Sequence, residues 1–202
     1  MKKLEKRTYS DMDLAVETRG DGMPVIRGHA AVFDTIASGG WFREKVAPGA
    51  FSESIKADDI RALWNHDTSI VLGRNRAQTL SLAEDTRGLA VEITPPDTAQ
   101  ARDLVETIRR GDVSQMSFGF QVLRQTWVEE EDEKDLRVID KVKLWEVSPV
   151  TFPFYEDTDV SLKSSHQEWR AGRQSAAGRA RKNIIYRRRL ELTLRQQQRG
   201  GI

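Results

Sequence analysis

Short strand-like runs recur at intervals of roughly ten residues in the first half of the chain, each bounded by turn-forming residues. This spacing is typical of a β-sandwich or a β-barrel, in which successive strands are joined by short connections. The runs are 60–64, 70–74, 79–83 and 88–94. Two earlier runs, 7–17 and 25–33, flank the turn-forming Gly20-Asp21-Gly22 and predict a hairpin-like opening.

One amphipathic helix is predicted after these strands. Pro95-Pro96 ends the preceding run, because proline cannot donate to a strand ladder. Asp97 or Thr98 can cap the helix, and Gly111 follows its end. The apolar positions have the spacing i, i+3, i+4 and i+7, which places Ala101, Leu104, Val105 and Ile108 on one buried stripe. A second, short helix is expected over 50–56.

Two longer runs, 116–128 and 136–147, alternate with the period of a strand and are expected to be neighbours in one sheet. The connection between them, 129–135, is almost wholly charged and should be a solvated hairpin tip, since burying it would be costly. It lacks the glycine of a calcium loop. The two prolines of 148–153 suit an edge or exit segment. In the first run one face carries Ser117, Gly119 and Gln121, and the opposite face carries Phe118, Phe120 and Val122. In the second run alternation predicts one common face for Val138, Asp140, Val142, Leu144 and Glu146.

Residues 163–202 differ from the rest in composition and charge. They are rich in Ser, Gln, Gly, Ala and Arg, a composition typical of linkers. Eleven basic and two acidic residues give this segment a net charge of +9, so residues 1–162 carry −8 of the total of +1. We therefore expect one folded domain over 1–162 and a basic, flexible tail over 163–202, in which 184–195 is the only segment with some helical character.

Composition and charge exclude several classes of function. The chain has no cysteine, which rules out disulfides, thiolate zinc sites and a cysteine nucleophile. Its basic start is not followed by an apolar segment, and no apolar run approaches the length of a bilayer span, so we expect no membrane partner and no secretion. A nucleic-acid partner is not expected either, because the body is acidic and the basic tail has only Trp169 and Tyr186 as aromatic residues.

Ser117 and His66 are the candidate pair for nucleophilic catalysis. A serine nucleophile needs a base, and imidazole is the side chain whose unperturbed pKa lies near neutrality. Of the three histidines, His29 lies within a strand of small residues and His166 within the tail, whereas His66 ends a strand just before a turn. Because the sequence around Ser117 is not a Gly-x-Ser-x-Gly elbow, the residues alone leave a structural serine and a structural histidine open.

Six short motifs, in order, resemble those of the prohead maturation proteases of tailed bacteriophages. The resemblance covers about residues 7–162, and it implies the fold of the herpesvirus assemblins: an α+β fold with a mainly antiparallel β-barrel and surrounding helices. The motifs are Gly28-His29-Ala30-Ala31-Val32-Phe33, Ala47-Pro48-Gly49-Ala50-Phe51, Trp64-Asn65-His66-Asp67, Leu72-Gly73-Arg74, Gln115-Met116-Ser117-Phe118-Gly119-Phe120 and Glu146-Val147-Ser148-Pro149-Val150-Thr151.

The resemblance implies a serine endopeptidase that cleaves scaffold and major capsid protein, and itself, during procapsid maturation. It would act in the cytoplasm of the bacterial host, inside the assembling procapsid, without a metal or organic cofactor. We expect the tail to dock an acidic partner in the shell or to be removed by self-cleavage; a disordered tail with no role stays open. An alternative is a non-catalytic capsid-assembly or scaffold-associated protein that acts through its basic tail. The presence of both Ser117 and His66 favours the enzyme.

By motif, His66 becomes the general base and Ser117 the nucleophile. Assemblins carry a histidine as the third, orienting group, and this sequence has none there. Glu146 is the favoured third residue because it follows Ser117 on the next strand and lies within a motif. Asp140, Asp67 and Asp34 stay open as alternatives. For the oxyanion hole, backbone amides near Ser117 and the side chain of Arg74 both stay open.

Overall fold

The computed structural model describes residues 4–9, 13–20, 22–39, 41–129, 134–152, 163–173 and 175. The chain divides into two compact units, Met1–Asp157 and Thr158–Ile202, and each is described by itself. In the second unit residues 163–173 are helical, where a flexible tail was expected. Ring contacts one turn apart favour this helix: His166 stacks on Trp169 and Arg173 lies over the same ring. The segment 184–195 lies outside the described residues.

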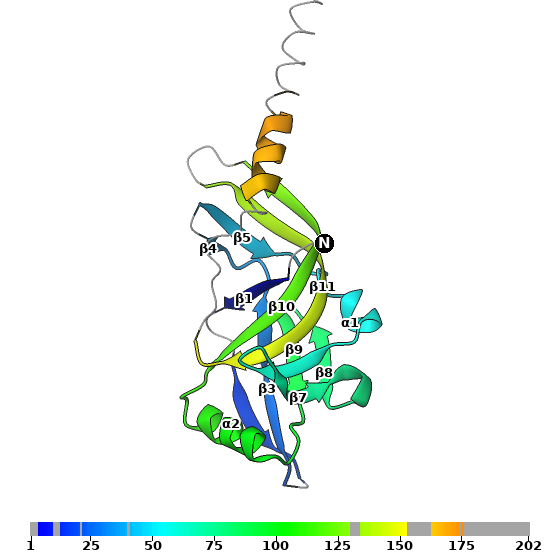
Figure 1. Cartoon of the computed structure of the whole chain (residues 1–202), viewed down its shortest axis with the longest axis vertical. Helices are drawn as coiled ribbons and strands as arrows, with labels where there is room; N and C mark the ends of the chain where they lie inside the picture. The colour runs from blue at the N-terminus through cyan, green and yellow to red at the C-terminus, as the bar shows by residue number, and fades with distance from the viewer. Residues whose placement is uncertain are drawn as a thin grey trace, which may run out of the picture. The chain divides into compact units, whose positions relative to one another are not determined.

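The larger of two sheets in the first unit has seven strands and is organised around one long hairpin (Figure 1). The strands of the hairpin are antiparallel, and the other edge of its second strand pairs in parallel with two shorter strands, β5 near its start and β6 near its end. The order is β1 (Glu5–Tyr9), β10 (Gln115–Val128), β11 (Leu136–Val150), β5 (Phe42–Val46) and β4 (Ala37–Gly39), while β6 (Arg61–Trp64) joins β11 to β7 (Asp67–Arg74).

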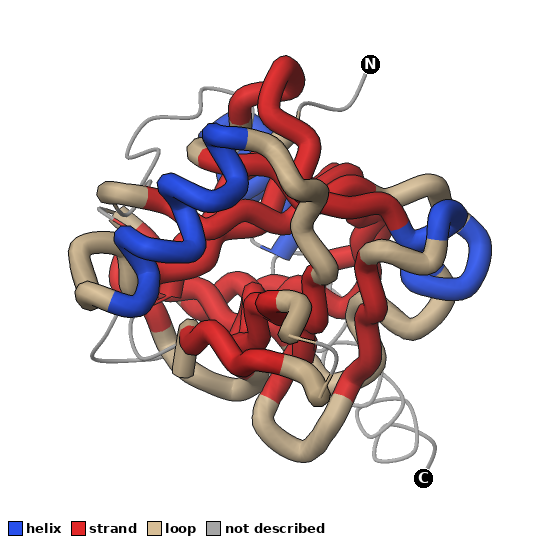
Figure 2. Tube along the Cα trace, turned by 90° about the horizontal axis from the view of Figure 1, so that it is seen from below, coloured by secondary structure: helices blue, strands red, loops and turns tan. Residues whose placement is uncertain are grey.

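The smaller sheet is antiparallel and contains a hairpin at the predicted turn after residue 18. The first strand predicted for this hairpin, 7–17, is wrong in part, because its start belongs to β1, which pairs with β10 in the larger sheet. Strands form most of the unit (Figure 2), and none of the described helices is long and apolar enough to cross a membrane. The sheet order is β2 (Ala15–Thr18), β3 (Pro24–Val32), β9 (Gly88–Ile93) and β8 (Leu80–Glu84); the helices are α1 (Ser54–Ala57), the short 3-10 turn η1 (Asn75–Ala77) and α2 (Ala99–Arg109).

The predicted amphipathic helix is confirmed as α2. The Oγ1 atom of Thr98 caps it by accepting a hydrogen bond from the amide of Ala101. Its four predicted apolar positions are all buried in the core. The short helix expected over 50–56 is α1, which begins at Ser54.

The α+β class is confirmed, but the closed barrel is not. The described strands form two open sheets: the larger ends at β1, β4 and β7, and the smaller at β2 and β8. Strand spacing alone cannot decide closure, because closure depends on pairing between strands that are distant in sequence. The prediction of an edge or exit segment after residue 147 is also wrong for Ser148, Pro149 and Val150, which belong to β11, an inner strand.

Irregular pairing along the hairpin changes which face Glu146 occupies. Gly119 pairs with Glu146, yet the next residue, Phe120, pairs with Leu144, so Trp145 is the extra residue of a β-bulge. Leu144 is buried in the core, whereas Glu146 lies on the face of Gly119. The predicted common face for Leu144 and Glu146 is therefore wrong, and the bulge at Trp145 is the reason.

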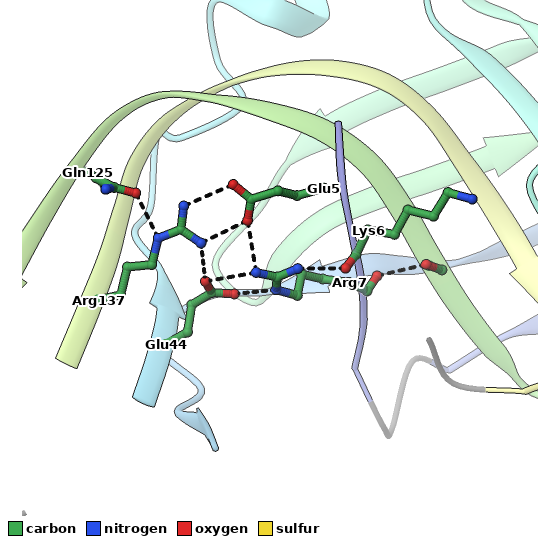
Figure 3. Close-up of polar contacts among 7 residues, drawn as sticks. Glu5, Lys6, Arg7, Glu44, Gln125 and Arg137 are labelled. Carbon is green, nitrogen blue, oxygen red and sulfur yellow. Dashed lines mark hydrogen bonds and ion pairs between the residues drawn. The ribbon is translucent and has the colours of Figure 1, made fainter. Parts of the chain in front are cut away.

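A buried cluster of charged side chains fixes β1 to the rest of the sheet (Figure 3). The guanidinium of Arg137 on β11, only 1% exposed, donates to Glu5 at 2.8 Å and to Glu44 at 2.6 Å. Arg7 on β1 donates to Glu44 at 2.6 Å and to Glu5 at 2.8 Å. The Nε of Arg137 also donates to Gln125 at 2.7 Å. Two cations and two carboxylates thus satisfy one another in the interior.

We expect Glu44→Gln to destabilise the protein by about 3 kcal/mol at neutral pH, because it leaves Arg7 and Arg137 short of a buried partner. Burial by itself would raise the pKa of Glu44, but the charges of Arg7 and Arg137 and their hydrogen bonds outweigh it and lower the pKa below 4.5. A carboxylate whose pKa is lowered by folding stabilises the protein at pH values above its pKa in the unfolded state. That stabilisation is lost as the pH falls through the pKa of the folded state.

Urea unfolding between pH 7 and pH 3 measures both effects. The wild type should lose stability as the pH falls below 4.5, the ordinary value for this carboxyl, and Glu44→Gln should lose less over the same interval. The matched control is Glu17→Gln, which removes an exposed partner of Arg27 and should change stability by less than about 1 kcal/mol. Equal pH dependence of Glu44→Gln and the wild type would contradict the role of the cluster.

Candidate active site

His66 lies in a strained two-residue turn at the tip of the β6–β7 hairpin. Trp64 pairs with Asp67, and the two residues between them, Asn65 and His66, have φ angles of 53° and 61°. A turn with two positive φ angles matches the twist of a hairpin and favours Asn-Gly. A histidine in the glycine position costs on the order of 1 kcal/mol or more. The turn would form more easily with glycine, so a histidine at this position indicates a functional role.

Asn65 ties this turn to the end of β11. Its backbone amide donates to the carbonyl of Pro149 at 3.0 Å. Its side-chain Oδ1 accepts from the amide of Thr151 at 2.8 Å, and its Nδ2 donates to the Oγ1 of Thr151 at 3.2 Å. Three hydrogen bonds from one residue therefore hold the hairpin tip against β11 and position the imidazole of His66. Sequence reasoning missed Asn65, although the Asn-His pair after a strand is a turn signal.

The carboxylate of Glu146 binds the imidazole of His66. The Oε1 of Glu146 lies 2.7 Å from the Nδ1 of His66, and the two side chains are only 9% and 8% exposed. An ionised carboxylate only accepts hydrogen bonds, so with Glu146 ionised Nδ1 donates to it and Nε2, which is also buried, is the ring nitrogen left to take a proton. The Oε2 of Glu146 accepts from the Oγ of Ser148 at 2.5 Å. Both oxygens of the carboxylate are thus fixed.

Gly119 makes room for this carboxylate. It lies directly opposite Glu146 in the β10–β11 pair. A Cβ atom at position 119 would lie 2.2 Å from the Oε1 of Glu146, the same oxygen that binds His66. No side chain can occupy this position unless the carboxylate moves. Neither Gly119 nor Ser148 was singled out from the sequence, although both lie within the quoted motifs.

Ser117 lies on the same face of the hairpin as Glu146. It pairs with Ser148, just as Gly119 pairs with Glu146, and alternate residues of a strand share a face. Directly opposed side chains have Cβ atoms about 4.5–5.5 Å apart, which brings Ser117 next to Ser148. Ser117 is fully buried, and its Oγ donates to the carbonyl of Arg7 on β1 at 2.9 Å. The Ser117 hydroxyl and the carboxylate that binds His66 therefore lie on one side of the hairpin.

The other carboxylates weighed for the third role bind partners elsewhere. Asp34 forms an ion pair with Lys45 at 2.6 Å. Asp67 accepts two hydrogen bonds from Ser69, whose hydroxyl is the main cause that lowers the pKa of Asp67. Asp140 accepts from the hydroxyl of Thr126 at 2.7 Å.

The other two histidines and Arg74 are likewise engaged away from this face. His29 binds Asp85 at 2.9 Å, and this hydrogen bond is the main cause that lowers the pKa of Asp85. His166 belongs to the helix of the second unit. The guanidinium of Arg74 donates twice to Asp59, at 2.8 and 2.6 Å, and lowers the pKa of that carboxyl to about 2. Within the described residues no group of three or more His, Asp or Glu side chains is arranged to hold a metal ion.

Comparison with known proteins identified a family and a similar solved structure. The model of the caudovirus prohead serine protease family matches residues 10–171, a range that includes His66, Ser117 and Glu146. Among solved structures, the capsid assembly protease of bacteriophage T4 is similar with a TM-score of 0.48 and 11% sequence identity, over 73% of this chain and 97% of that chain. The search of curated proteins gave no match.

Proposed function

The chain belongs to the caudovirus prohead serine protease family, and we propose that it is the endopeptidase that cleaves the scaffold and capsid proteins of its phage, and itself, as the procapsid matures. The family is one of serine proteases of the phage prohead. The choice of substrates and the self-cleavage are the part that we propose.

In this proposal Ser117, His66 and Glu146 carry the reaction. The Oγ of Ser117 attacks the carbonyl carbon of the scissile peptide while the Nε2 of His66 takes the hydroxyl proton. The imidazolium then gives that proton to the leaving amine as the C–N bond breaks, which leaves an acyl-enzyme. Water, deprotonated by the same imidazole, releases the acyl group. Glu146 stays ionised throughout, holds the imidazole tautomer and stabilises the imidazolium.

The single observation that carries the proposal is the contact between Glu146 and Nδ1 of His66 beside the face that holds Ser117. Buried carboxylate–imidazole pairs are also found in structural roles. Here, however, the histidine occupies a strained turn, its partner needs a glycine opposite, and a serine lies two residues from that glycine on the same face. A structural ion pair would need none of these features.

Co-expression with the scaffold and major capsid proteins of the same phage tests this function. We expect both proteins to be recovered from assembled particles as shorter chains with new N-termini, and the protease itself to be shortened, as read by intact mass and N-terminal peptide analysis. Particles assembled without the chain should contain the uncut proteins. If the proteins remain full-length in particles that contain the chain, the non-catalytic assembly role is the better explanation.

A further inference from the structure

A groove of about 950 Å³ opens beside Glu146 and crosses several strands of the larger sheet. Residues of β6, β7, β10 and β11 line it, together with Leu4 just before β1, Ala57 of α1, Asp58 and Asp59 after α1, and Arg76 of η1. Glu146 belongs both to this lining and to the candidate active site. The groove is therefore continuous with the face on which cleavage is proposed to occur.

The floor of the groove gathers large apolar side chains that are exposed to solvent. Leu4 is 44% exposed, Val71 45% and Trp145 44%. Leu63, the pairing partner of Val71, adds a buried apolar surface between them. Single exposed apolar residues are common, but a contiguous group in a concave site marks a place where a ligand binds. Trp145 is the extra residue of the β-bulge and lies within the stretch 143–146 of β11 that lines the groove.

The charged residues on the rim mostly bind one another. Asp59 is held by Arg61 at 3.2 Å and by Arg74 at 2.6 Å. Asp58 lies 3.7 Å from Lys143, whose ammonium lies 4.6 Å from the centre of the Trp145 ring. The rim carboxylates are thus already neutralised by cations of the protein. Selectivity then comes from the apolar floor.

We propose that this groove binds the polypeptide to be cut in an extended conformation, and that it selects an apolar side chain, aliphatic or aromatic, which packs on Trp145, Val71 and Leu63. The inference rests on the proposed function of the Ser117 face. Gln121, which lines the groove, is four residues from Ser117 on β10, roughly 13 Å at strand spacing. An extended substrate covers that length with about four residues, so a substrate cut at Ser117 can reach the groove with residues about four positions from the scissile bond.

Two readouts on the full chain test the groove separately from the chemistry. The first is cleavage of a random-sequence peptide library, with the cut sites identified by mass spectrometry and kcat/KM measured on a peptide so identified. The second is capture of the same library by the Ser117→Ala variant, which needs no catalysis. The test variants are Val71→Asp and Trp145→Ala. The matched control is Val128→Asp, a strand valine that is 40% exposed and does not line the groove.

We expect cut and captured peptides to be enriched in apolar residues on one side of the scissile bond. Val71→Asp and Trp145→Ala should weaken this enrichment and lower kcat/KM on the order of 10- to 100-fold, whereas Val128→Asp should match the wild type. If cleavage depends on Ser117 but is unchanged in both groove variants, the groove does not bind substrate as proposed, while the proposed function is still supported. If peptide capture depends on Val71 but no cleavage depends on Ser117, the groove is supported and the proposed function is contradicted. Captured peptides that show no enrichment in apolar residues would also contradict the proposed selectivity of the groove.

Discussion

We expect Ser117→Ala to abolish cleavage of the scaffold and capsid proteins and to lower kcat/KM on a peptide substrate by about 10⁴-fold or more. The change removes the only atom that forms the bond to the substrate carbonyl in the proposed reaction. It also removes one hydrogen bond, from the Ser117 Oγ to the carbonyl of Arg7, so a small loss of stability should accompany the loss of activity. Processing in co-expressed particles and kcat/KM on a peptide measure the effect.

The matched control is Ser69→Ala. Ser69 lies near the candidate site on β7, is exposed, and donates its hydroxyl to Asp67. The two variants therefore remove the same atom from serines of one sheet, but Ser69 is exposed on β7, whereas Ser117 is buried on β10 opposite Ser148. Ser69→Ala should retain activity within a few-fold of the wild type. Processing that survives Ser117→Ala would exclude Ser117 as the nucleophile.

The hydrogen bond from Ser117 to Arg7 has a consequence for this reaction. In the structure the hydroxyl points its proton at a β1 carbonyl, and Ser117 is fully buried. Transfer of that proton to His66 requires the hydroxyl to turn away from β1. The strand β1 is itself held by the buried cluster of Glu5, Arg7, Glu44 and Arg137. The stability of that cluster and the availability of the nucleophile are thus linked through one short strand.

Local patterns predicted the elements of the fold but not their assembly. Alternation and turn residues were enough for the β10–β11 hairpin and the N-terminal hairpin, and helical spacing for α2. These signals are local, because period and capping are fixed by neighbouring residues. The parallel pairing of β11 with β5 and β6 joins segments about ninety residues apart. No local pattern in the sequence encodes that pairing.

The same limit applies to the candidate site. The sequence pointed to His66, Ser117 and Glu146 through motifs, and the structure brings His66 and Glu146 into contact. The bulge at Trp145 could not be predicted, since strict alternation put Glu146 on the face of Leu144. Gly119 reads as an ordinary strand glycine until the carboxylate opposite is known. The residues that shape a site are therefore harder to find from sequence than the residues that react.

We expect Glu146→Gln to slow cleavage strongly, by about 10⁴-fold if Glu146 acts as the orienting carboxylate. Glutamine has nearly the same shape, but its amide is neutral and can donate to Nδ1, which would place the imidazole proton on Nε2, where the proton of Ser117 must go. A buried imidazolium would also lose its counter-charge. Steady-state kinetics on a peptide substrate give the effect. Near-normal turnover would exclude Glu146 as the orienting carboxylate.

Gly119→Ala separates the position of the carboxylate from its charge. The added methyl group would lie 2.2 Å from the Oε1 of Glu146, so the carboxylate must move away from His66 while remaining ionised. If Gly119 acts only through Glu146, the double variant Gly119→Ala/Glu146→Gln should be no slower than Glu146→Gln alone, because coupled changes are not additive. The control is Gly20→Ala, whose new methyl group meets no atom within 4 Å. Additive losses in the double variant would show that Gly119 supports the reaction by some route other than the carboxylate.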